Sequence, residues 1–279
     1  MSEKESLLNT LLGLSMIVEA RDPYTGGHLW RVSQFSRLLA QQAGLSRRDI
    51  SLCEVGGFLH DLGKVGVPDA ILNKPDRLTE AEYDIIKTHP SVGGRLLSSH
   101  PLAGLAMDAV VAHHERPDGR GYPHGIAGDV IPEVARIVSI ADAFDAMTST
   151  RAYRKGMPTE KAFSIIGSEL GSQFDQNLGK HFLALERMTD IVHIVGHSES
   201  GIPLLPCPSC SAPVVARATH RDGEHIYCRA CGGESRLHKQ DGLLQLEMTG
   251  GMGEASVLAP DCDTDLIGAM VTEIAPHLF

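Results

Sequence analysis

The strongest constraint on the fold is a helical repeat of apolar residues that runs from residue 5 to residue 190. Val32, Phe35 and Leu39 recur at intervals of three and four residues, which places them on one face of a helix. Leu102 and Leu105 begin a similar stripe, and runs with the alternation of a strand are scarce here. The pattern predicts an all-α body, including a helix that follows Pro132 and one that opens with a capping box at residues 79–82.

The composition changes after residue 190. Residues 196–206, "GHSESGIPLLP", have the composition of a linker, and two short β-like runs follow it between pairs of cysteines. Residues from 246 onward are Gly-rich and acidic, and are expected to be loose or to end in a short helix at 264–274. We therefore predict a helix start at 1–13, a helical domain at 14–190, a linker at 191–206, a β-rich module at 207–245 and a tail at 246–279.

The charge of the chain excludes some classes of partner. Its 279 residues carry a formal net charge of −10, which disfavours non-specific binding to nucleic acid or anionic lipid. The N-terminal "MSEKES" does not resemble a signal peptide, and the longest apolar run, "LLNTLLGLSMIVEA", is too short and too polar to span a bilayer. We expect a cytoplasmic protein with no nucleic-acid or membrane partner.

Histidines and aspartates interrupt the apolar pattern where helices face the core or end. His60 and Asp61 directly follow Phe58 and Leu59, and a buried carboxylate without a partner costs several kcal/mol. A single such histidine is more often structural, but seven residues share this placement: His28, His60, Asp61, His89, His113, His114 and Asp142. Imidazoles and carboxylates bind divalent Fe, Mn, Co, Ni or Zn, and a metal would compensate the buried charge.

The number of these residues predicts two metal ions. Two octahedral ions offer about twelve coordination positions, of which seven side chains with one bridging carboxylate fill about eight. A bridging hydroxide fills two more, which leaves about two for substrate oxygens. This is the arrangement of a two-metal hydrolase, in which the bridging water is acidified and becomes the nucleophile.

Four motifs resemble those of the HD-GYP family over about residues 14–186: "RDPYTGGH", "HDLGK", "KTHP" and "HHERPDGRGYP". The resemblance implies an HD-type helical bundle that hydrolyses cyclic di-GMP to linear pGpG or onward to GMP. It also implies that the seven residues above are the metal ligands, with Asp61 as the bridge and Fe or Mn as the ions. Some members hold a third metal through a glutamate at the position of Tyr24, so this chain is expected to hold two.

The resemblance also assigns substrate contacts. The expected catalytic residues are His60, Asp61 and Lys64, and the lysine, on the same helical face, would reach the substrate phosphate. "TSTRAYRKG" resembles a segment that binds phosphate and guanine, here through Arg151 and Arg154. A solvated lysine and a cation-rich helix end are the alternatives. The loop 116–125 is linked in the family with docking of diguanylate cyclase domains; we expect it to act as a scaffold and rim.

Two cysteine pairs predict a second metal site. Cys207 and Cys210 precede Cys228 and Cys231 by seventeen intervening residues, a spacing typical of a zinc ribbon with one structural zinc. Two disulfides are the alternative, disfavoured in a cytosolic chain. Residues 207–245 hold five Lys or Arg against four Asp or Glu, which favours a protein contact or a homodimer contact over nucleic acid.

The sequence thus predicts a mainly α protein, an HD-type bundle followed by a small β-rich zinc ribbon, that acts as a metal-dependent cyclic di-GMP phosphodiesterase. Two alternatives stay open. One is a phosphodiesterase for another cyclic dinucleotide, such as cyclic GMP-AMP. The other is a non-catalytic module that binds cyclic di-GMP and recruits a partner.

Overall fold

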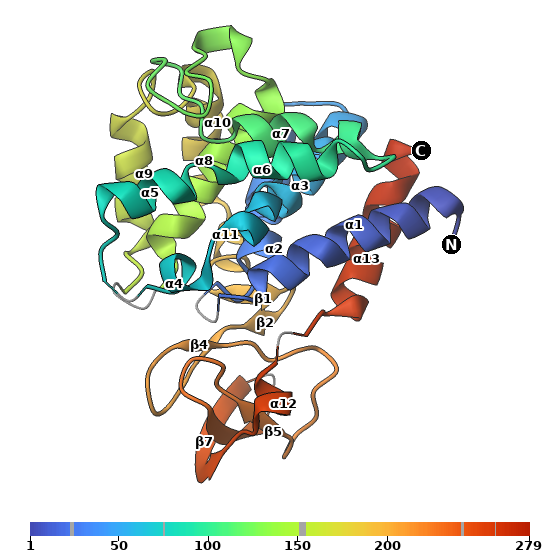
Figure 1. The fold of residues 1–279 in the computed structure, drawn as a ribbon, viewed down its shortest axis with the longest axis vertical. Coiled ribbons are helices and arrows are strands. Elements are labelled where there is room, and N and C mark those ends of the chain that lie inside the picture. The colour runs from blue at the N-terminus through green and yellow to red at the C-terminus, as the bar shows by residue number, and fades with distance from the viewer. Residues whose placement is uncertain (23–24, 75, 151–154, 241–242, 260) are drawn as a thin grey trace.

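The computed structural model describes residues 1–22, 25–74, 76–150, 155–240, 243–259 and 261–279. Figure 1 shows a helical body and, below it, a smaller module of strands. The α-helices are α1 (Glu3–Glu19), α2 (His28–Gln42), α3 (Arg47–Leu59), α4 (Asp69–Leu72), α5 (Glu80–Ile86), α6 (His89–Leu97), α7 (Met107–Ala112), α8 (Glu133–Thr148), α9 (Thr159–Ser168), α10 (Gln176–Ala184), α11 (Thr189–Val192), α12 (Ala255–Leu258) and α13 (Thr264–Leu278). The 3₁₀ helices are η1 (Leu62–Gly66), η2 (Ala103–Leu105), η3 (Gly128–Val130) and η4 (Leu185–Arg187).

The strands form three small antiparallel sheets. They are β1 (His197–Glu199) with β2 (Ile202–Pro203), β3 (Leu205–Pro206) with β4 (Pro213–Val214), and β5 (His225–Tyr227) with β6 (Gly233–Gln240) and β7 (Leu243–Met252). The predicted class, a mainly α body followed by a small β-rich module, is confirmed. Within the described ranges, every helix is too short or too polar to cross a lipid bilayer.

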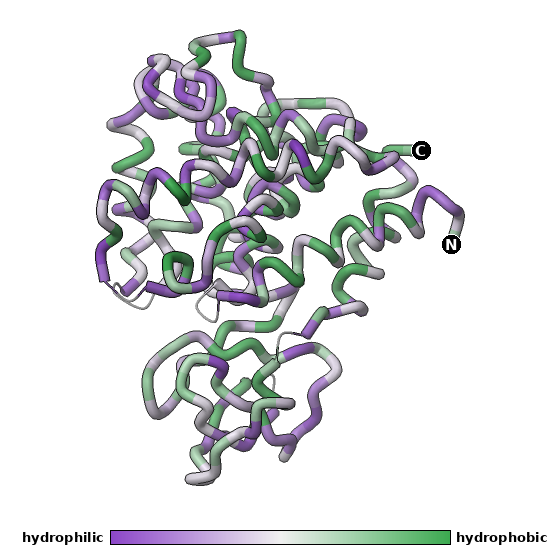
Figure 2. The backbone as a smooth tube through the Cα atoms, in the orientation of Figure 1, coloured by the Kyte–Doolittle hydropathy of each residue, from purple (hydrophilic) through white to green (hydrophobic). Residues whose placement is uncertain are grey.

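Local sequence signals explain where the helices begin. The Ser2 side chain caps α1 and the Thr79 side chain caps α5, each in a reciprocal capping box with a glutamate three residues later. Pro132 is the N-cap of α8, as its fixed φ favours. The rings of Phe35 and Phe144 lie 5.1 Å apart in the centre of the body, where both side chains are fully buried. Apolar residues recur along these helices in Figure 2, which is the predicted helical repeat.

The C-terminal segment is not loose, and its helix is longer than the predicted 264–274. Helix α13 runs to Leu278 and packs against α1 and α3, beside the N-terminal helix in Figure 1. Ile267 and Ile274 are buried in the main core, and Arg48 Nη1 donates to the Leu278 carbonyl at 2.7 Å. The physical reason is an apolar stripe at three- and four-residue spacing, which must bury itself against the body.

The β-rich module also extends past its predicted boundary at residue 245. Strand β7 continues to Met252 and pairs with β6, with Leu246 opposite the fully buried Leu237. The glycines of this stretch concealed the strand, because glycine weakens the expected strand pattern. The segment predicted as a linker, 191–206, likewise contributes β1, β2 and β3.

Glu54 provides a test of the packing between α2 and α3. It is 3% exposed, and Gln34 Nε2 donates to its carboxyl oxygen at 3.0 Å. Burial raises the pKa of Glu54 from 4.5 to about 7, although Arg37 and Gln34 act in the opposite direction. The folded protein therefore binds this proton more tightly than the unfolded chain does. The contribution of protonated Glu54 to the stability of the fold is complete below pH 4.5 and is lost as the pH rises through about 7.

We predict that Glu54→Gln raises the free energy of unfolding at pH 8, by up to about 3 kcal/mol, and flattens its pH dependence between 4.5 and 7. Urea unfolding across this pH range measures both effects. Glu186→Gln, at an exposed position in η4, is the control and should keep the wild-type slope. An unchanged slope in Glu54→Gln would contradict the burial argument.

Candidate metal centre

Helix ends bring the predicted ligands together. His60 is the C-cap of α3, His89 is the first residue of α6, and His113 is the C-cap of α7. At a helix end the chain changes direction, so these side chains can point into the space between helices. Gly63 allows η1 to approach α6 closely, because a Cβ at this position would lie 1.9 Å from the carbonyl oxygen of His89.

Backbone carbonyls orient three of the imidazoles. The Nδ1 atoms lie 2.7 Å from Gly57 O for His60, 2.8 Å from Ile86 O for His89, and 2.9 Å from Ala109 O for His113. A carbonyl oxygen only accepts hydrogen bonds, so each Nδ1 carries the proton and donates it. Each Nε2 is consequently left with a lone pair, the form in which histidine binds a metal.

The Nε2 atoms point at one another. Those of His89 and His113 lie 3.1 Å apart, and both are acceptors because their Nδ1 atoms hold the protons. The Nε2 atom of His60 is fully buried without a hydrogen-bond partner among the described residues. Facing lone pairs in a buried site are unfavourable unless a cation lies between them. The donor set therefore fits divalent metal ions.

Asp61 lies between two groups of these ligands. Its Oδ2 atom is 3.4 Å from His28 Nε2 and 3.3 Å from His60 Nε2, whereas its Oδ1 atom is 3.4 Å from His89 Nε2. Donor atoms lie within 4.8 Å of one another in three overlapping sets: His28, His60 and Asp142; His60, Asp61 and His113; His89, His113 and His114. The structure thus brings all seven predicted residues together, with a carboxylate in the position of a bridge.

Burial sets the protonation of the histidines. It lowers the pKa of His89 to about 4 and that of His114 to about 3, so both are neutral at pH 7. His28 differs: burial acts to lower its pKa, but hydrogen bonds to Asp145 and Asp61 outweigh this and raise it to about 9. Burial acts to raise the pKa of Asp61, yet Lys64 and His60 hold it well below its usual value.

The comparisons with known proteins agree with this geometry. Residues 13–178, more than half of the chain, match a family model described as HD domain. The chain belongs to the HD domain family. This confirms the family predicted from the sequence motifs, and the matched range contains all seven candidate ligands of the HD site.

Several curated proteins are similar to the HD domain. "Cyclic di-GMP phosphodiesterase response regulator RpfG" of Xanthomonas campestris is 41% identical over 168 residues, 60% of this chain and 44% of that protein. "Cyclic di-GMP phosphodiesterase" of Thermotoga maritima is 39% identical over 191 residues, 67% of this chain and 52% of that protein. "3'3'-cGAMP-specific phosphodiesterase 3" of Vibrio cholerae is 40% identical over 177 residues, 63% of this chain and 38% of that protein. The chain thus spans about half or less of the length of these relatives.

Two residues that support the HD site were missed at the sequence level. Asp145 Oδ2 lies 2.7 Å from His28 Nδ1, and Asp145 also pairs with the buried Arg31, whose Nε is 2.5 Å from Oδ1. This arrangement orients His28 as the carbonyls orient the other imidazoles. Asp145 follows Asp142 by three residues in α8, and Arg31 follows His28 by three in α2. That i,i+3 spacing is the signal that could have revealed them.

The loop 116–125 contacts the HD site through Tyr122. The ring of Tyr122 stacks on that of His114, with centroids 4.6 Å apart. Glu115, 1% exposed, accepts backbone N–H bonds from His124 at 2.7 Å and from Ile126 at 3.1 Å. The loop thereby buttresses the imidazole of His114. Glu115 was also missed, although it directly follows the histidine pair.

The predicted substrate contacts are only partly described. Helix α3 ends at Leu59, so Lys64 does not continue the same helix as predicted, but lies in η1 after a turn of the chain. Its Nζ atom still reaches Asp61 Oδ2 at 2.5 Å, at the edge of the HD site. Arg151, Arg154 and Tyr24 lie outside the described residues.

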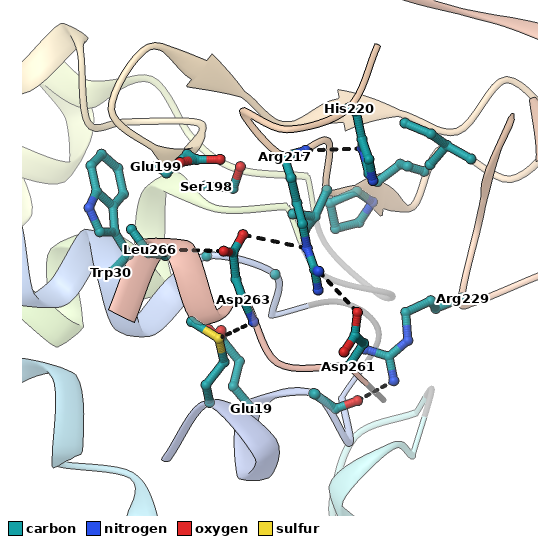
Figure 3. Close-up of a pocket in the computed structure, with 18 of the residues that line it drawn as sticks. Glu19, Trp30, Ser198, Glu199, Arg217, His220, Arg229, Asp261, Asp263 and Leu266 are labelled. Carbon is teal, nitrogen blue, oxygen red and sulfur yellow. Dashed lines mark hydrogen bonds and ion pairs between the residues drawn. The ribbon is translucent and has the colours of Figure 1, made fainter. Parts of the chain in front are cut away.

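Two cavities lie near the N-terminal end of α2. A small one, of about 20 Å³, is lined by His28, Asp61 and Lys64 at the HD site. A larger one, of about 270 Å³, lies instead between the helical body and the β-rich module, with Trp30 and Tyr227 in its wall (Figure 3).

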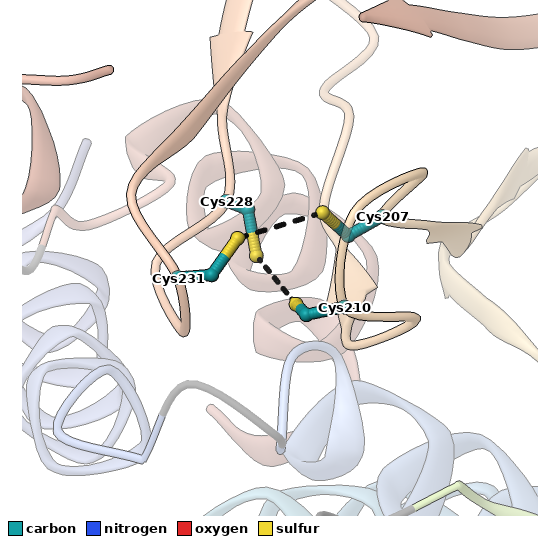
Figure 4. A group of neighbouring side chains, drawn as sticks. All are labelled: Cys207, Cys210, Cys228 and Cys231. Atoms are coloured by element: carbon teal, nitrogen blue, oxygen red, sulfur yellow. Dashed lines mark hydrogen bonds between the residues drawn. The ribbon is translucent and has the colours of Figure 1, made fainter.

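The four predicted cysteines also come together (Figure 4). The Sγ atoms of Cys207 and Cys231 are 3.7 Å apart, and those of Cys210 and Cys228 are 3.6 Å apart. Four sulfurs around a tetrahedral zinc with bonds of about 2.3 Å would lie about 3.8 Å apart, whereas a disulfide requires about 2.05 Å. Burial opposes ionisation of Cys207, but backbone N–H groups of Cys210 and Ser209 outweigh it and lower its pKa to about 7. The group fits a tetrahedral metal.

We predict that Asp145→Asn destabilises the protein by about 3–5 kcal/mol, because it leaves the charge of the buried Arg31 without its carboxylate. Urea unfolding at pH 7 measures this loss. Asp190→Asn in α11 removes an exposed carboxylate and is the control, expected to change stability by about 0.5 kcal/mol or less. A loss below about 1 kcal/mol in Asp145→Asn would contradict the role of the pair.

Proposed function

We propose that this chain is a metal-dependent phosphodiesterase that hydrolyses cyclic di-GMP. The observation that carries the proposal is the position of Asp61, whose two carboxylate oxygens face separate histidine groups. That geometry suits a bridge between two divalent ions, for which we propose Fe or Mn because the donors are imidazoles and carboxylates. Relatives that are 41% and 39% identical carry the name cyclic di-GMP phosphodiesterase, which supports the choice of substrate.

The residues of the two groups would divide the ligation. One ion would be held by His28, His60 and Asp142, the other by His89, His113 and His114, with Asp61 shared between them. Bound in this way, the ions would supply a hydroxide nucleophile and bind oxygens of the scissile phosphate. Asp145 keeps the Nδ1 side of His28 occupied, so that its Nε2 atom stays directed into the site.

The remaining groups would act on the substrate. A water oxygen bonds to phosphorus, the bond from phosphorus to the 3′ oxygen breaks, and the leaving oxygen takes up a proton. The ammonium of Lys64, at the edge of the site, would offset charge that develops on the phosphoryl or leaving oxygens. Arg151 and Arg154 are proposed to bind phosphate and guanine through their planar guanidinium groups.

Cyclic GMP-AMP is a second candidate substrate. A Vibrio cholerae relative named as specific for 3′3′-cGAMP is 40% identical, close to the value of the relatives named for cyclic di-GMP. The two substrates share the same phosphodiester backbone and differ in one base. The base-binding residues would therefore decide between them, while the metal ligands would serve either reaction.

We predict that the protein purified with Mn²⁺ or Fe²⁺ converts cyclic di-GMP to linear pGpG or GMP. We also predict that the double variant His60→Ala, Asp61→Ala loses both its metal and its turnover. Both substitutions remove donors at the shared centre of the site. Chromatography of the products and metal analysis of the protein provide the measurements. Incubation with 3′3′-cGAMP in parallel separates the two substrates.

His181→Ala is the matched control, because this histidine is exposed in α10 and should leave metal content and turnover unchanged. Absence of turnover of either dinucleotide by wild-type protein with both metals bound would rule out the proposed activity. Tight dinucleotide binding in that case would instead indicate the non-catalytic module. Full activity in the double variant would contradict the site assignment.

We further propose that the four cysteines hold one structural zinc ion. The prediction is one zinc per chain, lost in Cys228→Ser together with the order of the β-rich module, since so small a core depends on the metal. Metal analysis and hydrogen exchange of residues 202–252 measure the two effects. Cys262→Ser, outside the cysteine group, should keep the zinc. A zinc-free wild type that keeps the same exchange protection would refute the structural role.

A further inference from the structure

The β-rich module that carries the four cysteines, residues 207–252 and called the cysteine module below, contacts the segment that leads into the HD site. Arg229 lies between Cys228 and Cys231, and its Nη2 atom donates to the backbone carbonyl of Ala20, the C-cap of α1. Its Nε atom also donates to the Leu258 carbonyl at 3.4 Å. Figure 3 shows the Arg229 guanidinium reaching this junction beside Asp261. One arginine thus joins the cysteine group to the end of α1, eight residues before His28.

A second contact holds the start of α2. Gly27 has a φ of +74°, and a Cβ there would lie 2.6 Å from the Cα atom of Ser198 in β1. A Cβ on Gly26 would lie 2.4 Å from Val215 Cγ2. Real Cβ atoms do not approach so closely, so Gly26 lets Val215 of the module, and Gly27 lets β1, lie directly against the backbone that precedes His28.

A third contact reaches the imidazole itself. Arg31 Nη1 donates to the His197 carbonyl of β1 at 2.8 Å and to the Gly26 carbonyl at 2.9 Å. The same guanidinium pairs with Asp145, which is hydrogen-bonded to His28 Nδ1. An unbroken series of polar contacts therefore runs from the backbone of the β-rich part to a proposed metal ligand.

Arg229 is an exposed residue, although its guanidinium contacts the backbone of α1. The carboxylates of Asp22, Asp261 and Glu19 lie near enough to interact with its charge. Glu19 is half-buried, and its carboxylate accepts the N–H of Leu29 at 2.9 Å, within the first turn of α2. Glu19 thus lies near Arg229 and also binds the first turn of α2.

We propose that the cysteine module, when its four thiolates hold a metal, positions His28 and thereby raises the affinity of the HD site for its own ions. Arg229 is the positioning residue that transmits this effect. A closed four-thiolate site holds residues 228–231 in one conformation, which keeps the guanidinium against Ala20. When the cysteine group holds no metal, the start of α2 is less ordered. Binding of ions at the HD site must then order these residues as well, which costs conformational entropy. The inference rests on the proposed metal centres and is independent of the substrate.

The test compares Mn²⁺ affinity of the HD site in the full chain, since Mn²⁺ prefers imidazole and carboxylate donors to thiolates. We expect Arg229→Ala to keep one zinc per chain, to weaken Mn²⁺ binding about fivefold or more, and to increase hydrogen exchange at residues 25–32. Arg229→Lys retains a donor for the Ala20 carbonyl and should restore part of the affinity. Arg236→Ala, exposed on β6, is the matched control and should bind Mn²⁺ as the wild type does.

Removal of the proposed zinc site tests the same coupling independently of Arg229. Cys228→Ser should weaken Mn²⁺ binding to a similar extent, and adding Arg229→Ala to it should cause little further loss, because both changes break the same contact. Wild-type Mn²⁺ affinity in both Arg229→Ala and Cys228→Ser would overturn the proposal. If Arg229→Ala fails to fold, the Mn²⁺ affinities of Arg229→Lys and Cys228→Ser test the proposal instead. These readouts stand even if no cyclic dinucleotide is turned over, so failure of the proposed activity is distinguishable from failure of this coupling.

Discussion

The interaction on which the site depends is the hydrogen bond from a buried imidazole Nδ1 to a fixed acceptor. Carbonyl oxygens accept it from His60, His89 and His113, and the carboxylate of Asp145 takes this position for His28. Each bond determines which nitrogen holds the proton and directs the other nitrogen inward. Without these acceptors the imidazoles could rotate or exchange tautomers, and their Nε2 atoms would no longer converge on Asp61.

The helical body and the β-rich module meet near the segment that precedes His28. Helix α13 returns from the module to pack on α1 and α3, so the module is connected to the body at both ends. Arg229 and Arg31 cross the junction at the segment before His28. If the module holds the proposed zinc, its ordered conformation would support this segment better than a flexible extension could.

The ligand set could be predicted because each residue carried a clear local signal, whereas Asp145 and Arg31 carried only their three-residue spacing from Asp142 and His28. Apolar spacing placed His28, His113 and Asp142 toward the core, and His60, Asp61 and His89 interrupt the pattern or follow a helix end. Asp145 and Arg31 act through contacts with residues up to 166 positions away, and their spacing along the helices does not specify those partners. The turn after Leu59 was missed because three-residue spacing alone does not distinguish an α-helix from a chain that changes direction.

The sequence by itself determined the helical class of the body, the seven candidate ligands and the tetrad of cysteines, since periodicity and ligand spacing are properties of neighbouring residues. Only the tertiary structure decided that Asp61 faces two histidine groups, that β7 extends the module and that α13 closes the core. It also decided that Arg229 meets Ala20. These features depend on pairing between distant segments, and such pairing is set by the burial of complementary surfaces after the chain has folded.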